Sequence, residues 1–133
     1  MSVELIQSLR EQYQEPHEQA ILNWAEENDV ENVVFYPQNH PTVLITWISP
    51  DPEGRELFRE IDIVFDRSGG VRVSGGAMYH APTYHLAWLP VRHGKKEEIA
   101  HLLGELKPQV DQLRFEDMTD MDAYLGILLD LAF

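Results

Sequence analysis

The residues best equipped for chemistry lie in one stretch, 79–93, which combines histidines with aromatic side chains. Its candidate ligand-binding residues are Tyr79, His80, Tyr84, His85, Trp88 and His93. A histidine can act as an acid or base near neutral pH, and aromatic rings can line a ligand pocket. The stretch therefore indicates a small-molecule or metal-binding protein, or an enzyme, as one class of function.

The three histidines of this stretch do not have the spacing of a metal site. Their gaps are five and eight residues, whereas metal ligands commonly lie two apart in strands and three or four apart on helices. The chain has no cysteine, which excludes thiol nucleophiles, disulfides and cysteine-ligated metals. No catalytic triad order, nucleophile elbow or phosphate loop is visible. We therefore predict no metal, no cofactor and no catalytic residue, and a non-enzyme is favoured over an enzyme.

The formal net charge is −13, and nearly all of it comes from the two ends of the chain. Residues 1–32 carry eight acids and one base, and residues 115–133 carry five acids and no Lys or Arg. Nucleic acids and anionic membranes are bound through Lys and Arg, so neither is expected as a direct partner. The acidity serves either solubility or a basic protein partner. Candidate partner-binding residues are Glu26, Glu27, Asp29, Glu31, Glu116 and Asp117.

A chain of 133 residues is expected to form a single domain, 1–133, with one core. Its start lacks the basic and continuously apolar segments of a secretory signal. No apolar run reaches the roughly 18 to 20 residues of a membrane-spanning helix. These features predict a cytoplasmic protein that is not integral to a membrane.

Alternating apolar residues and turn residues predict four or five strands in the middle of the chain. They are expected near 33–36, 42–49, 56–66, 71–74 and 83–89. Because 42–49 is apolar on both sides, it is predicted to be covered, at least in part, on both faces. The Gly75-Gly76 pair is interpreted as a strand end or a bulge.

The hairpin 56–74 has a predicted register. Odd-numbered positions are apolar in both strands, so odd residues must pair with odd residues if one face is to enter the core. This favours the three-residue loop 68–70, with Gly70 in the left-handed conformation. The predicted pairs are Phe65 with Val73, and Asp66 with Arg72 as a surface ion pair.

Helical spacing of apolar residues predicts helices on both sides of the strands, near 2–13, 16–28, 95–106 and 120–133. Pro16 either kinks the first of these helices or starts the second. Trp24 is expected in the core, His101 in solvent, and Pro108 at the end or at a bend of its helix. The last helix is predicted to begin with a capping box at Thr119 and is apolar around most of its circumference. It either fills the groove between sheet and helices or joins two copies as a homodimer.

Together these elements predict an α+β fold. It consists of a four- to five-stranded, largely antiparallel β-meander with N-terminal and C-terminal helices packed on one face. The favoured hypothesis is a non-enzymatic cytoplasmic protein-binding module whose acidic surface meets a basic protein partner, as immunity proteins, antitoxins and chaperones do. The alternative is a small-molecule or metal-binding protein, or an enzyme, that uses the segment 79–93.

Overall fold

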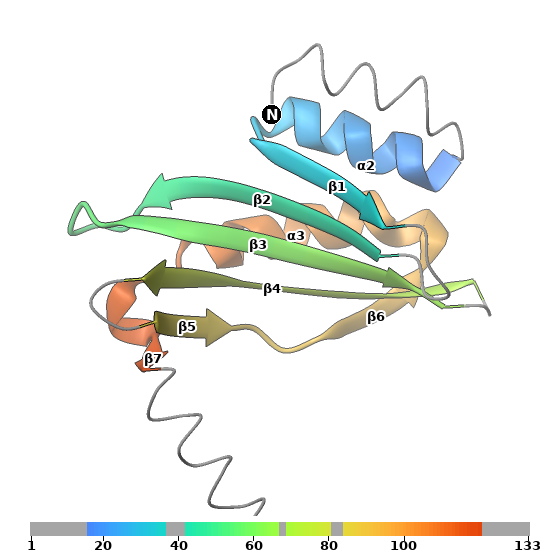
Figure 1. The fold of residues 1–133 in the computed structure, drawn as a ribbon. Helices are drawn as coiled ribbons and strands as arrows, with labels where there is room; N and C mark the ends of the chain where they lie inside the picture. Colours follow the sequence, from blue (N-terminus) through green and yellow to red (C-terminus); the bar gives the residue numbers. More distant parts are fainter. Residues whose placement is uncertain (1–15, 37–41, 67–68, 81–83, 121–133) are drawn as a thin grey trace, which may run out of the picture.

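The structure is a computed structural model that describes residues 16–36, 42–66, 69–80 and 84–120. Figure 1 shows its elements in chain order. They are α2 (Pro16–Glu27), β1 (Asn32–Tyr36), β2 (Thr42–Pro50), β3 (Glu56–Phe65), β4 (Gly70–His80), β5 (Tyr84–Trp88), β6 (Arg92–Lys95), the 3-10 turn η1 (Lys96–Glu98), α3 (Ile99–Asp111), the 3-10 turn η2 (Phe115–Asp117) and β7 (Thr119–Asp120). The predicted helix 2–13 and residues 121–133, with the predicted homodimer contact, lie outside the described residues.

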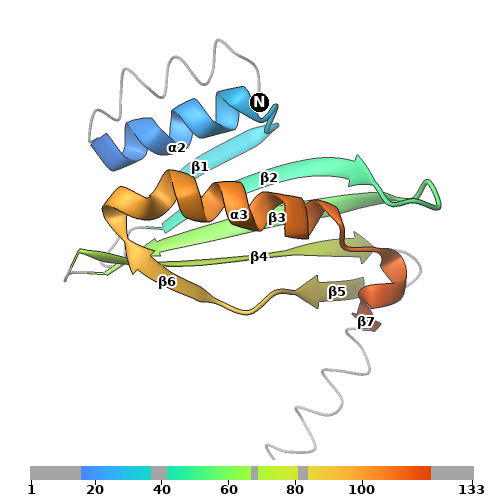
Figure 2. The ribbon, with the colours of Figure 1, turned by 180° about the vertical axis from the view of Figure 1, so that it is seen from behind.

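The strands form one antiparallel sheet in the order β1-β2-β3-β4-β5-β7, and β6 pairs with β4 beyond the end of β5. β3 and β4 are the long central strands, and each is paired along most of its length. Helices α2 and α3 lie on the same side of the sheet (Figure 2). The α+β fold with helices on one face is therefore confirmed.

The core lies between this sheet and the two helices. Helix α2 contributes Ile21 and Leu22, and helix α3 contributes Leu103 and Leu106, all with no exposed surface. Trp24 is 7% exposed and belongs to the same cluster, as predicted. His101 lies on the solvent side of α3, as predicted, with 71% of its side chain exposed.

The hairpin between β3 and β4 keeps the predicted parity but not the predicted register. Phe65 lies opposite Val71, and Arg72 lies opposite Val64 rather than Asp66. The predicted pairs were therefore wrong by two residues. Asp66 instead closes the turn, because its carboxylate accepts the N–H of Gly70 at 2.9 Å and its own N–H donates to the Gly70 carbonyl at 3.0 Å. Gly69, not Gly70, takes the left-handed conformation, with φ of +90°.

The second half of β4 contradicts the interpretation of Gly75 and Gly76 as a strand end, because the strand runs through both glycines to His80. Close packing explains both residues. A Cβ at Gly75 would lie 2.8 Å from Val110 of α3. A Cβ at Gly76 would collide with the ring of Trp88 and the carbonyl of Ala87. The glycines let a helix approach one face of β4 and an aromatic ring approach the other.

Three boundaries near the C-terminus also differ from prediction. Helix α3 continues through Pro108 to Asp111. The residues before it form the short strand β6, which extends the sheet beyond the predicted five strands. Thr119 and Asp120 pair with β5 as β7 instead of beginning a helix.

Candidate binding surface on the open face of the sheet

The sheet has two faces that can be separated by residue parity. In β2, β3 and β4 the odd residues point toward α2 and α3, and we call this side the inner face. The even residues of β1 to β5 point the other way, and we call that side the outer face. No helix in the described part of the chain covers the outer face (Figures 1 and 2).

The outer face gathers the exposed apolar side chains of the described residues. Six large apolar side chains are exposed, and five of them lie on this face. Those five are Tyr36, Ile48, Phe58, Tyr84 and Trp88. The sixth, Val91, lies between β5 and β6. A concentrated patch of this kind marks an interaction surface more often than scattered exposed residues do.

β2 has one well-covered side and one partly covered side. Val43, Ile45 and Trp47 on its inner face are buried, whereas Leu44 is half-buried and Ile48 is 44% exposed. β2 lies between β1 and β3. In the described part of the chain its second apolar side belongs to the outer face and is covered only in part, most fully at Leu44.

A groove of about 430 Å³ lies at the end of the outer face where β2 and β3 meet β4 and β5. Its lining residues are Ile48, Glu56, Phe58, Met78, Tyr79, His80 and Tyr84. The Tyr84 hydroxyl donates to the Met78 sulfur at 3.2 Å, and the rings of His80 and Tyr84 lie 5.0 Å apart. The groove is large enough for one or two side chains or a small ligand.

Two carboxyl groups, which we call the acid pair, lie side by side on the outer face of the central strand β3. They are Glu60, between Thr46 and Gly76, and Asp62, between Leu44 and Ser74. Burial, a hydrogen bond from one carboxyl to the other and the repulsion between them raise the pKa of Glu60 to about 7. Burial also raises the pKa of Asp62. The two groups therefore share a proton near neutral pH.

The structure brings only three of the six sequence-predicted ligand residues together. Tyr79, His80 and Tyr84 come together at the groove. Trp88 lies farther along the outer face over Gly76, and His93 lies opposite Arg72 on β6.

His85 lies on the inner side of β5, directly opposite Tyr79, whose ring is also on the inner side. Its ring contacts Phe115 at 4.8 Å, and the ring of Tyr79 contacts the same residue at 5.2 Å. Phe115 also receives the Arg55 guanidinium at 4.7 Å from its ring centroid. The rings of Tyr79 and His85 therefore pack η2 against the sheet.

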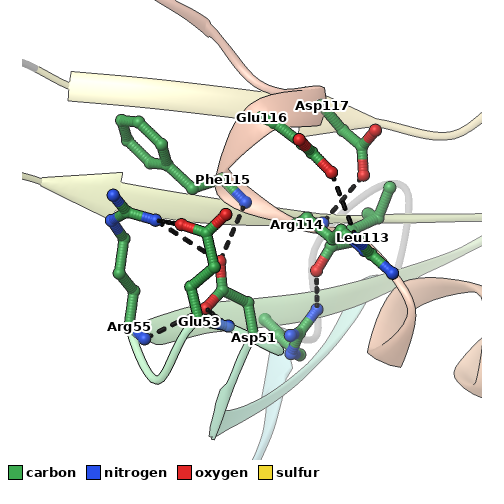
Figure 3. Close-up of polar contacts among 9 residues, drawn as sticks. Asp51, Glu53, Arg55, Leu113, Arg114, Phe115, Glu116 and Asp117 are labelled. Atoms are coloured by element: carbon green, nitrogen blue, oxygen red, sulfur yellow. Dashed lines mark hydrogen bonds and ion pairs between the residues drawn. The ribbon is translucent and has the colours of Figure 1, made fainter.

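The loop between β2 and β3 is tied to η2 by a network around Asp51 (Figure 3). Asp51 is 6% exposed, and its carboxylate accepts N–H groups of Glu53 and Arg55 at 3.0 Å and of Phe115 at 3.3 Å. Burial acts to raise the pKa of Asp51, but these backbone hydrogen bonds and the nearby Arg55 hold it below its usual value. The network is structural and fixes the groove end of the sheet.

The predicted partner-binding acids occupy two separate elements. Glu26 and Glu27 are the last two residues of α2, and Asp29 and Glu31 lie between α2 and β1. Glu27, Asp29 and Glu31 are exposed, and Glu26 is half-buried. Glu116 and Asp117 belong to η2, where they bind Arg114 through its side chain at 3.2 Å and its N–H at 2.8 Å respectively (Figure 3).

The acid pair and its apolar neighbours were missed as a site, although the sequence carried a signal. Along the even-numbered side of β3, Phe58 and Val64 flank Glu60 and Asp62, so this side combines apolar and acidic residues. Arg59 is a charged residue at an odd position among otherwise apolar odd residues, and this pattern indicates a buried charge on the inner face.

Among the described residues, no group of three or more His, Asp or Glu side chains could hold a metal ion. Nor does any helix in that part of the chain have the length and apolar character needed to cross a membrane. Comparison with protein-family models, curated proteins and solved structures finds no significant match.

Proposed function

We propose that this chain is a non-enzymatic, cytoplasmic protein-binding module whose outer sheet face receives a segment of another protein. One observation carries the proposal, namely that the exposed aromatic and aliphatic side chains gather on a face that no described helix covers. Exposing such a patch is costly in water, and burying it against a partner recovers roughly 25 cal/mol per Å² of apolar area.

The net charge of −13 supports a basic partner. Exposed acids at 27, 29 and 31 and in η2 give the surface a negative field. Such a field speeds association with cationic proteins even where the charges make no contact in the complex. In this proposal these acids steer the partner, and the outer face binds it.

A photo-crosslinking amino acid placed in the native host tests the proposal. Phe58 is 43% exposed on the outer face, and His101 is exposed on the opposite side of the molecule. A crosslinker at position 58 is expected to capture one discrete protein, whereas the same group at 101 should not. Identical adducts from both positions, or none from 58, would contradict the proposal.

A small-molecule site is the second candidate, and the groove is the observation that favours it. It brings together three of the predicted residues, Tyr79, His80 and Tyr84, within a volume typical of ligand sites. NMR screening of small aromatic and cationic fragments tests it. Chemical-shift changes confined to these residues, and lost in His80→Ala, would support this second function.

A further inference from the structure

We propose that the partner segment is amphipathic, with apolar side chains that pack across the outer face beside the groove and a Lys or Arg that lies over Glu60 and Asp62. This inference rests on the proposed function and adds the chemistry of the partner.

The apolar part of the layout is a row that crosses four strands. Ile48 pairs with Phe58, Phe58 with Met78, and Met78 with Leu86. Neighbouring strands lie about 4.8 Å apart, so the row is about 14 Å long. One face of a short helix, or one side of a short strand, could cover this row.

The acid pair lies beside this row. Glu60 is two residues from Phe58 along β3, a separation of about 7 Å on one face. The residues directly across from Glu60 and Asp62 are Thr46, Leu44, Ser74 and Gly76, none of which carries a charge. The pair therefore presents negative charge in a neutral and apolar setting, where a cation would find little competition from neighbours.

Asp62 gives independent support for an incomplete site. Its Oδ1 is buried, yet it has no hydrogen-bond partner in the described part of the protein. A buried acceptor without a partner costs free energy, and a guanidinium or ammonium group would satisfy it. The same cation would replace the proton that the acid pair shares.

The other charged or titratable side chains on this face stand farther from the pair. Arg72 is diagonal to Asp62 on β4, and His93 on β6 lies opposite Arg72. Glu56 and His80 lie at the groove.

Charge complementarity also indicates whether the bound segment comes from this chain, from a second copy of it or from a different protein. Residues 121–133 contain Asp122 and Asp130 and no Lys or Arg, and residues 1–15 contain three acids and one Arg. Two copies meeting through their outer faces would bring two acid pairs together. A basic segment of a different protein therefore complements the acid pair better than residues 1–15, residues 121–133 or a second copy of the chain does.

Selection of displayed random 12-residue peptides on the intact chain at pH 8 tests the inference. Peptides that combine apolar residues with a Lys or Arg are expected. Their binding should fall at least tenfold in the Glu60→Gln/Asp62→Asn double variant and in Phe58→Ser. At pH 6 binding to the unaltered chain should be about tenfold weaker than at pH 8, because the cation must displace a proton.

The outcomes separate the two proposals. Peptides that lose binding in Phe58→Ser but show no preference for Lys or Arg would overturn this inference and leave the proposed function intact. If no selected peptide depends on Phe58, both are overturned. The double variant should be at least as stable as the unaltered chain at pH 8, as circular dichroism and thermal unfolding can verify, so its lost binding would not reflect unfolding.

Discussion

The two faces of the sheet treat charge in opposite ways, although the residues concerned are neighbours on β3. Arg59 on the inner face is fully buried, and its guanidinium donates to Ser49 Oγ at 2.5 Å, to the Leu113 carbonyl at 3.1 Å and to the Val110 carbonyl. Glu60 and Asp62 on the outer face instead share a proton and repel one another. The first arrangement stabilises the fold, whereas the second lowers its stability, as expected of groups retained for the binding role that we propose.

Arg59 should show the largest effect on stability. It holds carbonyls at the C-terminal end of α3, where the helix dipole is negative and the last carbonyls need donors. Replacing Arg59 by Ala removes its hydrogen bonds to Ser49 Oγ and to the Leu113 and Val110 carbonyls, and it opens a cavity in the core. We expect the free energy of unfolding to fall by about 4 kcal/mol, measured by urea denaturation.

Arg55 is the matched control for that experiment. It lies just before β3, is partly exposed, pairs with Glu53 and has its guanidinium over the Phe115 ring. Arg55→Ala should cost about 1 to 2 kcal/mol, less than Arg59→Ala, because exposed ion pairs and exposed cation–π contacts each contribute about 1 kcal/mol or less. Equal losses for Arg55→Ala and Arg59→Ala would show that Arg59 does not anchor the helix.

Two isoleucines on β2 allow the two faces to be compared by the same type of substitution, Ile to Ala. Ile45 is fully buried on the inner face, and Ile48 is 44% exposed on the outer face. Ile45→Ala is expected to cost about 3 kcal/mol and Ile48→Ala less than about 1 kcal/mol in urea denaturation. A loss of several kcal/mol at Ile48 would mean that the outer face is part of the core.

The close packing on the outer face of β4 can be tested at Gly76. Gly76→Ala places a methyl group against the Trp88 ring and the Ala87 carbonyl. We expect this overpacking to lower the unfolding free energy by about 2 kcal/mol. Gly104→Ala is the control, since that exposed position on α3 has open space around it and should gain about 0.5 to 1 kcal/mol from helix propensity. Thermal unfolding of both variants checks the contrast.

Gly75 and Gly76 also show which features of the fold could not be predicted from the sequence. Periodicity located β1, β2, β3 and β5 to within about a residue, because half-buried strands alternate along the chain. The predicted fourth strand ended before Gly75, whereas β4 continues to His80. The contacts that require glycine at 75 and 76 come from Val110 and Trp88, which are not sequence neighbours. Local pattern cannot report such contacts.

The candidate site was predictable only in part, for a related reason. The parity of the hairpin was correct, and it assigns Glu60 and Asp62 to one face. The odd–even pattern does not show whether that face is covered by other elements. Nor does it show how far the neighbouring strands bury the two carboxyl groups. The raised pKa values follow from that crowding.

The acid pair provides the last and smallest test of the comparison. Glu60 has a pKa of about 7 in the folded chain against 4.5 for an unperturbed glutamate. Between these values the folded chain holds a proton that the unfolded chain releases, so the free energy of unfolding should fall as pH rises from about 4.5 to 7. Below this range the two states are equally protonated, and above it the full cost is present.

Glu60→Gln removes this ionisation while keeping the shape of the side chain. The variant should match the unaltered chain near pH 4 and exceed its stability by about 1 to 2 kcal/mol at pH 8, a gain reduced by partial exposure and by the remaining Asp62. Glu56→Gln, exposed on the same face, is the control and should change little. Urea denaturation at several pH values gives the comparison. If Glu60→Gln were destabilising at pH 8, the carboxylate would be holding the fold together, and the distinction between a structural inner charge and a binding outer charge would fail.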